Sequence, residues 1–524
     1  MAQKERENWA TERKNVCMAQ KERENWATER KNACMAQKER ENWATERKKA
    51  CMAQKVRENW ATGRKKACMA QKERENWAIR RKKAYMAKRE QLNSYKSTWH
   101  TKFINTNGGI NLMNAKQLLN EAYEIEEKLV EDRRYFHTYP EVGFDLVKTR
   151  EYVKKELVSM GYEPVDCGKA GVIALAGGKK PGKVFMIRGD MDALPVQEES
   201  DVEFVSRHEG KMHACGHDMH TAMMLGAARL LKTHEDEIAG TVKLCFQPSE
   251  ENFEGSHDMI QAGLLQNPHV DAALMIHVTA AAPMPAGTVI VCSGGVSAPA
   301  ADYFTIRIQG KGCHGAMPQN GIDPITVAAH MITALQELNA RELAMADEAA
   351  LTIGTIHAGI AENVIPDTAQ MGGTLRTYDE ETRAMLKERM REICSGIAKV
   401  FRASAEVEFT SGCPSLLNDK EVSESVTQYT KELLGAGKAF SMAEIQAMAE
   451  ASNSKASRAT GSEDFAYVSR EVPAVMLALA AGQPEQGYIY PQHHPKVKFD
   501  EAVLPAGSAV YAYTAMRWLE EHEK

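Results

Sequence analysis

Apolar positions along the chain follow two kinds of pattern, and the pattern changes near Met113. From there on, short apolar runs alternate with longer segments of helical periodicity. The runs are GVIALAG (171–177), KVFMIRG (183–189), TVKLCFQ (241–247) and DAALMIHV (271–278). Largely apolar runs of this length are typical of strands covered on both faces, with helices as the connections between them. We therefore predict an α/β fold built on a buried, largely parallel sheet.

A different rhythm occupies roughly residues 299–411. Segments with strand and helix character follow one another there in the order strand, helix, strand, strand, helix, strand. This βαββαβ order predicts a compact second domain of ferredoxin-like type. Because the first pattern resumes afterwards, we predict that residues 113–298 and 412–524 form one α/β domain and that 299–411 is inserted into it.

The first 85 residues are five copies of a 17-residue unit, MAQKERENWATERKNVC in the first copy. On a continuous helix, equivalent residues of successive copies are rotated by about 100°, so the repeated Trp would not share one face. Recent duplication of a coding segment explains the near-identity of the copies. The alternative is a basic helix whose Trp residues contact nucleic acid or anionic lipid. Residues 86–112 are interpreted as a linker.

Charge divides the chain in the same way. The first 100 residues carry 27 Lys and Arg against 13 Asp and Glu, whereas the rest carries 39 against 58. The chain of 524 residues is 43% hydrophobic, which excludes a disordered protein and allows two or three domains. The sequence contains no run of about 18 apolar residues, and its N-terminal segment is charged. We therefore expect a cytoplasmic protein without membrane spans. Eleven Cys in such a chain do not predict a disulfide framework.

Polar side chains with metal-binding chemistry follow the ends of the predicted strands. Asp190 and Asp192 come after one strand, Glu250 and Glu251 after another, and His277 closes a third. Cys215 and His217 lie in a turn between the first and the second of these strands. Carboxyl ends of parallel strands are where open α/β sheets bind ligands, and Cys, His and Glu together suit a transition metal. A solvated acidic loop is the simpler interpretation of the two Glu residues, but the apolar strand before them argues against it.

Eight segments in order carry a resemblance to a known family: RGDMDALPVQEE, GKMHACGHDMHTAM, FQPSEEN, IHV, GKGCHGAMPQNGIDP, ENVIPDTAQMGGTLRT, GSEDFAY and HHPKVKFDE. They resemble the signatures of metal-dependent amidohydrolases related to hippurate hydrolase, N-acyl-amino-acid amidohydrolases and auxin-conjugate hydrolases. The resemblance covers residues 113–524 and none of the repeats.

The resemblance implies a site for two divalent metal ions (Mn, Zn, Co or Ni). The implied ligands are Cys215, His217, Glu251, His277 and His493. We choose His493 over His494 because relatives place this ligand two residues before a Pro, here Pro495. Asp190 and Asp192 then lie behind the ligands and orient them.

The same resemblance implies the remaining roles. Glu250 is the general base, and His314 of the inserted domain stabilises the oxyanion in the active site of a partner subunit. Asn363 and Arg376 hold the substrate, since the guanidinium of Arg suits a carboxylate. The inserted domain would thus be a lid and the dimerisation domain of a homodimer.

The predicted function is metal-dependent hydrolysis of the amide bond in N-acyl or N-aroyl amino acids, which are small-molecule substrates. Dipeptidase and N-acetyl-diaminopimelate deacetylase activities are alternatives with the same chemistry. A metal-binding but inactive regulator is disfavoured because Glu250 and the five ligand positions are intact. The last alternative makes the basic repeats an interaction module. Nucleic acid is not an expected partner of the enzyme part.

Overall fold

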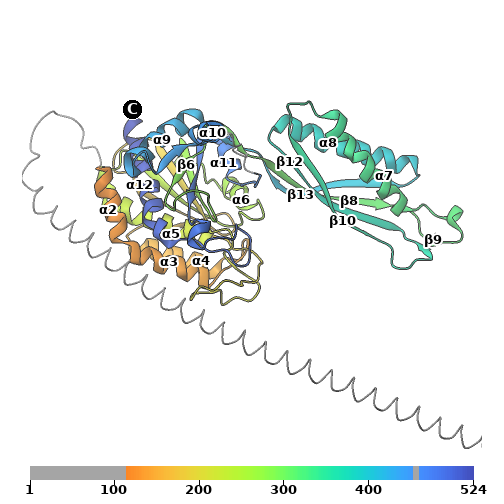
Figure 1. Cartoon of the computed structure of the whole chain (residues 1–524), viewed down its shortest axis with the longest axis horizontal. Helices are drawn as coiled ribbons and strands as arrows, with labels where there is room; N and C mark the ends of the chain where they lie inside the picture. The colour runs from red at the N-terminus through yellow and green to blue at the C-terminus, as the bar shows by residue number, and fades with distance from the viewer. Residues whose placement is uncertain (1–113, 452–459, 524) are drawn as a thin grey trace, which may run out of the picture. The chain divides into compact units, whose positions relative to one another are not determined.

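A computed structural model describes residues 114–451 and 460–523 of the chain (Figure 1). The predicted repeats (1–85) and linker (86–112) lie outside the described residues. Two main sheets form the described part, and each has a buried core of its own.

The larger sheet has eight strands in the order β1-β2-β4-β3-β5-β16-β6-β15. In chain order they are β1 (Val165–Cys167), β2 (Gly171–Gly177), β3 (Val184–Asp190), β4 (Thr241–Gln247), β5 (Ala272–Thr279), β6 (Val289–Val291), β15 (Ala439–Ser441) and β16 (Ala474–Ala480). Strands β4, β3, β5 and β16 are parallel neighbours, so their carboxyl ends meet at one edge of the sheet.

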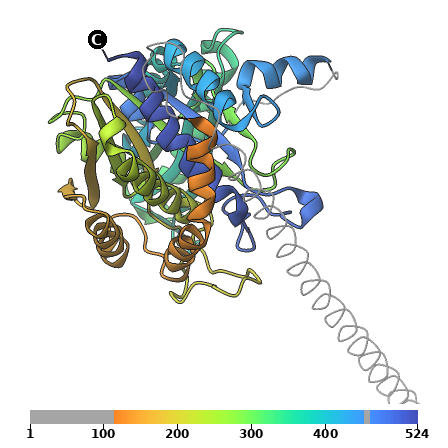
Figure 2. The ribbon, with the colours of Figure 1, turned by 90° about the vertical axis from the view of Figure 1, so that its left-hand side faces the viewer.

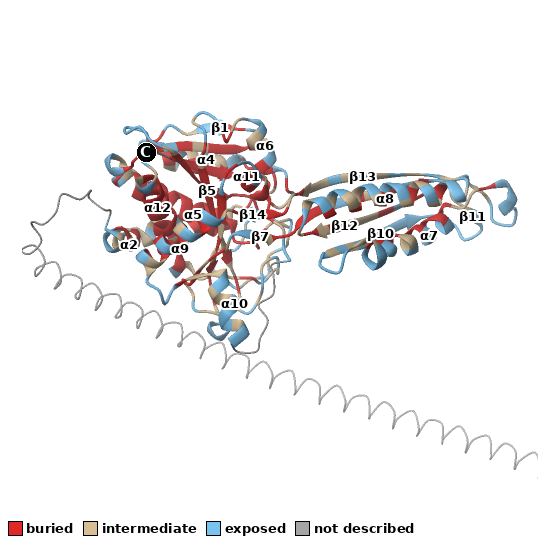
Figure 3. Cartoon of the chain, turned by 90° about the horizontal axis from the view of Figure 1, so that it is seen from above, coloured by how far each residue is buried: buried red, intermediate tan, exposed pale blue. Residues whose placement is uncertain are grey.

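Helices cover both faces of this sheet, which explains why its central strands are apolar at most positions. Successive residues of β3 alternate between two cores, with Phe185 and Ile187 in one and Val184 and Met186 in the other. The first core packs against α2 (Ala115–Glu124), α3 (Glu126–Thr138), α4 (Val147–Ser159), α5 (His217–Thr233), α9 (Lys420–Leu434) and α12 (Leu504–Glu521). The second core packs against α6 (Gly255–Gln261) and α11 (Ala466–Glu471). Buried residues, coloured red, gather around β5, α5 and α12 (Figure 3).

Helices α5 and α12 are buried along most of their length because they contact both the sheet and the outer helices. Helix α2, coloured orange, lies along α12, coloured dark blue (Figure 2). Helix α10 (Met442–Ala451) has no buried residue. None of the helices in residues 114–451 and 460–523 is long and apolar enough to cross a membrane.

The prediction of a largely parallel sheet was wrong for the GVIALAG strand. This strand, β2, is antiparallel to both of its neighbours, and the sheet as a whole is mixed. Only residues 178–183 connect β2 to β3. A parallel connection needs a crossover of about a dozen residues or more, so this short loop reverses the chain instead.

The smaller sheet occupies residues 300–413 and has the order β10-β12-β8-β13. Its elements along the chain are β8 (Ala300–Gln309), α7 (Pro324–Glu337), β10 (Ala349–Ala358), β12 (Thr368–Thr377), α8 (Glu380–Val400) and β13 (Ser404–Cys413). Both helices pack on one face, where Phe304, Ile306 and Ile308 are buried with residues of α7 and α8. One covered face explains the alternating pattern of these strands.

Two short strand pairs lie at opposite ends of the smaller sheet. Strands β7 (Gly295–Ala298) and β14 (Leu416–Asn418) pair where the chain enters and leaves it. Strands β9 (Cys313–His314) and β11 (Val364–Ile365) pair beyond its other end, next to Gln309 and Thr368. Ten residues of strand separate the two ends, a span of about 30 Å.

An ion-paired His at the end of α5 gives a pH-dependent contribution to stability. His234 lies 2.6 Å from Glu121 of α2 and 2.9 Å from Glu237. Burial acts to lower the pKa of His234, but the two carboxylates outweigh it and raise that pKa above its ordinary value. The stabilisation is therefore complete below the ordinary pKa and is lost as pH rises through the raised one.

We expect His234→Gln to lower the free energy of unfolding by about 1 kcal/mol at pH 6 and by less at pH 8.5. Denaturant unfolding of the wild type and the variant at both pH values measures the difference. A loss that is equal at the two pH values would mean that the charged form of His234 does not stabilise the fold.

Candidate active site

The polar residues predicted from the sequence converge at the carboxyl edge of the larger sheet. Asp190 is the last residue of β3, His277 lies near the end of β5, and Glu250 and Glu251 follow β4 in a turn. Cys215 precedes α5 and His217 begins it, so the helix N-terminus brings both residues to the same edge. Parallel pairing of β4, β3 and β5 is what aligns these ends.

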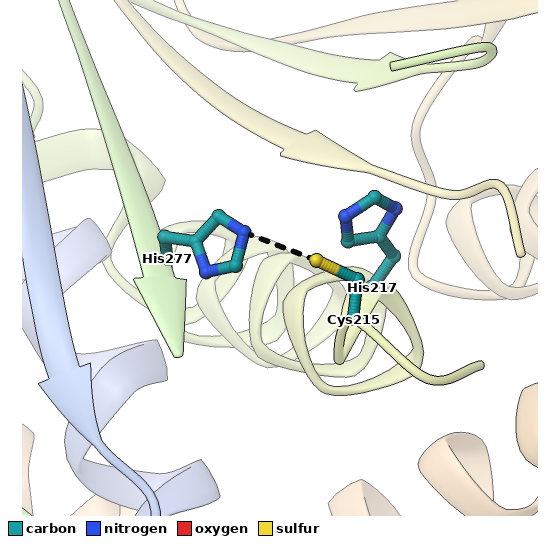
Figure 4. A group of neighbouring side chains, drawn as sticks. All are labelled: Cys215, His217 and His277. Carbon is teal, nitrogen blue, oxygen red and sulfur yellow. Dashed lines mark hydrogen bonds between the residues drawn. The ribbon is translucent and has the colours of Figure 1, made fainter. Parts of the chain in front are cut away.

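Five side chains form overlapping groups of potential metal ligands: Cys215, His217, Glu251, His277 and His493. In each of the groups Cys215–His217–His277 and Cys215–Glu251–His493, the donor atoms all lie within 4.8 Å of one another. The Cys215 Sγ atom lies 3.5 Å from Nε2 of His277, and His217 comes from the adjoining helix turn (Figure 4). The structure therefore brings together all five side chains of the predicted ligand set.

Hydrogen bonds to the backbone turn the imidazoles of His217 and His277 toward the group. His217 Nδ1 donates to the backbone oxygen of Asp192 at 2.9 Å, and His277 Nδ1 donates to that of Val278 at 2.7 Å. The lone pair of each Nε2 atom is then directed at the other potential metal-ligand atoms, as in metal-binding His residues. His217 Nε2 and Glu251 Oε1 are buried without a hydrogen-bond partner among the described residues. Donor chemistry and unpaired atoms together fit divalent cations.

Protons and cations compete for these atoms. Burial, together with Glu251, raises the pKa of Cys215 well above its ordinary value, and burial raises the pKa of Glu251 to about 7. Burial lowers the pKa of His277 to about 4, which keeps its imidazole neutral. Because metal ligands must be deprotonated, metal affinity at this site is expected to fall as pH decreases.

Asp192 holds the turn that carries the two Glu residues. Its carboxylate accepts the backbone N–H groups of Glu250 at 3.0 Å and Glu251 at 3.3 Å. The turn is tight: Ser249 has a positive φ of 52°, and a Cβ on Gly255 would lie 1.6 Å from the Pro248 oxygen. Asp192 also orients His217, chiefly through its backbone oxygen.

Asp190 lies behind His217. Its carboxylate accepts from Arg188 Nη1 at 2.7 Å and from His220 Nδ1 at 2.5 Å, and it lies 3.6 Å from His217 Nε2. Burial acts to raise the pKa of Asp190, but His217 and Arg188 hold that pKa well below its ordinary value. A carboxylate that stays ionised at this position favours positive charge in its surroundings.

The His493–His494 pair divides into one residue at the site and one outside it. His493 Nε2 lies 3.6 Å from Glu251 Oε1, and its backbone, at a positive φ of 65°, donates to the Ala214 oxygen. A positive φ is uncommon for a residue other than Gly and is often found at functional sites. His494 instead stacks on Tyr490.

The predicted residues of the smaller sheet do not come together within one chain. Arg376 lies near the last residue of β12, at the end of the sheet that is next to β7 and β14. Its Nη1 donates to Ser462 Oγ at 2.6 Å. His314 and Asn363 are neighbours at the opposite end, where Asn363 accepts from Gly315 N–H through its backbone oxygen. The length of β12 thus separates Arg376 from the other two residues.

Comparison with known proteins identifies the family of the chain. The profile of Peptidase family M20/M25/M40 matches residues 186–517. The chain belongs to this family. It is 36% identical to thermostable carboxypeptidase 1 of Saccharolobus solfataricus over 77% of this chain and 98% of that protein. It is 35% identical to N-acetyl-L-cysteine deacetylase of Bacillus subtilis over 76% of this chain and 90% of that protein.

A solved structure of the same family supports the fold. It is the Bacillus subtilis YXEP protein, described as a dinuclear metal-binding peptidase of the M20 family. The match has a TM-score of 0.61 and 32% identity and covers 76% of this chain and 99% of that one. The family resemblance inferred from the sequence is confirmed, and this member of the M20 family is a metal-dependent amidohydrolase.

Sequence reasoning missed four buried residues of this M20 site: Arg188, His220, Glu463 and Asp464. His220 is three residues after His217, on the same face of α5, and this spacing could have indicated it. Arg188 directly precedes the Gly-Asp of one signature, and Glu463 and Asp464 stand within another. Charged residues in otherwise apolar strands or inside a signature were the available signal.

Proposed function

We propose that the chain hydrolyses the amide bond of N-acyl or N-aroyl amino acids and releases a carboxylic acid and a free amino acid. The observation that carries this proposal is the position of Glu250, a buried carboxylate in the turn next to five potential metal ligands. The activity of the Bacillus subtilis relative, a deacetylase of N-acetyl-L-cysteine, supports the substrate class. The dinuclear YXEP protein supports two divalent ions, held by Cys215, His217, Glu251, His277 and His493.

Bound divalent ions would polarise a water molecule and the substrate carbonyl. Glu250 is suited to accept the proton from that water, because burial and then Glu463 and Glu251 raise the pKa of its carboxyl group well above the ordinary value. The water oxygen attacks the carbonyl carbon and gives a tetrahedral oxyanion. Glu250 then passes the proton to the nitrogen of the leaving amino acid as the C–N bond breaks.

Arg376 is proposed to bind the carboxylate of the amino-acid half of the substrate. It lies next to the loop of Ser462, which leads directly into Glu463 and Asp464 beside the base. A guanidinium donates two parallel hydrogen bonds to a carboxylate. Asn363 and His314, at the far end of the same sheet, are proposed to serve a partner subunit, with His314 donating to the oxyanion.

If Arg376 serves its own chain and Asn363 and His314 serve a partner, the protein is a homodimer formed through the smaller sheet. The surface of this sheet supports the homodimer. Strand β10 is an edge strand of ten residues, and an unpaired edge can pair with a second copy. Exposed apolar residues accompany this edge and the far end of the sheet: Met317, Ile325, Ile356, Ile360 and Val364. Surfaces of this kind are typical of contacts between subunits.

Release of a free amino acid from a panel of substrates tests the proposal. The panel contains N-acetyl and N-benzoyl amino acids, dipeptides and N-acetyl-diaminopimelate, each assayed after loading with Mn, Zn, Co or Ni. We expect acyl amino acids to be the best substrates. Hydrolysis of dipeptides alone would assign the chain to the alternative peptidase activity, and absence of any product would contradict the proposal.

Glu251→Gln is expected to lower metal content, because the amide lacks the anionic oxygen that a divalent cation prefers. A decrease in affinity of at least about tenfold is expected, as measured by elemental analysis after dialysis. Glu254→Gln, at an exposed position three residues further on, is the control and should retain its metals. Full metal occupancy in Glu251→Gln would remove Glu251 from the proposed ligand set.

Deleting residues 1–112 is expected to leave hydrolysis within about twofold of the full chain, because a domain with its own core folds alone. All the signatures lie after this segment, and the repeats have no continuous apolar face with which to dock. Solubility and kcat/KM of a protein starting at Met113 measure the outcome. Loss of soluble, active enzyme would show that the repeats contribute to the fold.

A further inference from the structure

One buried guanidinium connects several of the loops around the site. Arg188 of β3 is only 1% exposed, and each of its nitrogens donates to a neighbour. Its partners are Gln247 (Nε, 2.8 Å), Asp190 (Nη1, 2.7 Å), Met275 (Nη1, 3.7 Å to Sδ), Glu463 (Nη2, 2.9 Å) and Asp464 (Nη2, 2.9 Å). These five contacts match the five N–H donors of a guanidinium, so Arg188 is fully used within the protein.

Three buried carboxylates meet beside this guanidinium. Oxygen atoms of Glu250, Glu463 and Asp464 lie within 4.8 Å of one another. Like charges at this distance repel, and the ion pairs of Arg188 with Glu463 and Asp464 compensate part of that repulsion. Glu250 also belongs to the group formed with His217 and Glu251, so it lies between the potential metal ligands and the acid cluster.

Asp464 contacts both ends of the turn that carries Glu250. Its Oδ1 accepts from Gln247 Nε2 at 2.7 Å, just before the turn, and its Oδ2 accepts from Ser256 N–H at 2.9 Å, just after it. Its own backbone N–H donates to Glu250 Oε1 at 3.3 Å. One residue therefore closes the turn from both sides and contacts the carboxylate of the base.

We propose that Asp464, anchored by Arg188, is a positioning residue that fixes the orientation of the Glu250 carboxylate. The inference rests on the role of Glu250 in the proposed function and extends it to residues outside the ligand set. A base must lie within hydrogen-bond distance of the proton it takes, and a misplacement of about 1 Å can slow a reaction about 100-fold. A small rotation of Glu250 therefore slows turnover without changing substrate binding.

Asp464→Asn is the sharpest test because it preserves shape. Its oxygen can still accept from Arg188 and Gln247, but its NH2 group then faces the Ser256 N–H, and two donors cannot bond to each other. We expect kcat to fall about 10- to 100-fold, with KM within about threefold of wild type and metal content unchanged.

A matched control separates this effect from general destabilisation. Asp302 is equally buried and is paired with Arg383 at 2.6 and 2.9 Å, but it lies in the smaller sheet. Asp302→Asn should lower the melting temperature and leave kcat unchanged. Equal losses of kcat in the two variants would overturn the proposal.

A double-mutant cycle tests whether Asp464 acts through the base. In a Glu250→Gln background, Asp464→Asn should lower the remaining kcat by less than about twofold, because the group that it positions is already absent. A full additional 10-fold loss would overturn the proposal. If Asp464→Asn does not fold, Gln247→Leu is judged by the same criteria. It removes the Gln247 contacts with Arg188 Nε and Asp464 Oδ1, and the direct ion pair of Arg188 with Asp464 leaves no buried charge unpaired.

Crystal structures give a readout that does not depend on turnover. In the Asp464→Asn variant, we expect the carboxylate of Glu250 to leave hydrogen-bond distance of the residue 464 N–H. An unchanged carboxylate position would overturn the inference. A wild-type enzyme that releases no amino acid from any substrate would contradict the proposed function instead, and the crystal structures would still decide the geometric inference.

Discussion

Replacing Glu250 by Gln is expected to lower kcat about 100- to 10,000-fold, the range in which general bases contribute to catalysis. The amide has the shape of the carboxylate, so it can still accept the Asp464 N–H through its oxygen. It cannot accept a proton from water at neutral pH, and the proton relay to the leaving nitrogen is lost. Steady-state kinetics with the best acyl amino acid measures the effect.

Metal content shows whether the lost activity is a defect of the base alone. Glu250→Gln should keep the metal content of the wild type, in contrast to Glu251→Gln. Activity comparable to wild type would mean that another group takes the proton. Loss of metal together with activity would move Glu250 from the base to the ligand set.

Mixing two inactive variants is expected to restore up to about one quarter of wild-type activity. His314→Ala and Glu250→Gln would carry their defects on different chains if His314 completes the site of its partner. Random exchange of equal amounts makes half of the dimers mixed, and two-fold symmetry gives each mixed dimer one intact site of two. The position of His314, a full strand length away from Arg376, is the reason for this expectation.

Subunit exchange has to be demonstrated independently, for example by light scattering and by mass spectrometry of differently labelled chains. Mixing Glu250→Gln with a second preparation of itself is the control and should restore nothing. Proven exchange without recovery would assign His314 to the site of its own chain or to a structural role. An active enzyme that remains monomeric would exclude the cross-subunit arrangement.

The sequence predicted the strands of this protein better than their pairing. TVKLCFQ coincides with β4 because burial on both faces leaves a mostly apolar run with clear ends. The same kind of run in GVIALAG indicates that β2 is buried, but it does not indicate that β2 is antiparallel to β4. Pairing direction depends on the connections, and here the short loop 178–183 was the informative feature.

The site, too, could be predicted from local sequence patterns but not from contacts between distant residues. Residues close in the sequence, such as Cys215 and His217, could be recognised as one motif. The contact of Arg188 with Asp464 joins positions 276 residues apart, and no local pattern reports such a contact. Asn363 and Arg376 were assigned to one role from their motifs, yet β12 separates them within the chain.

The place of β16 in the larger sheet has a consequence for how the chain matures during synthesis. This strand comes late, at residues 474–480, and lies between β5 and β6, which were made about 200 residues earlier. Until it leaves the ribosome, the edges of β5 and β6 that β16 will occupy are open and can pair with other nascent chains. The smaller sheet is contiguous in the chain and complete at Cys413. It can therefore fold first, while the edges of β5 and β6 that later pair with β16 are still open.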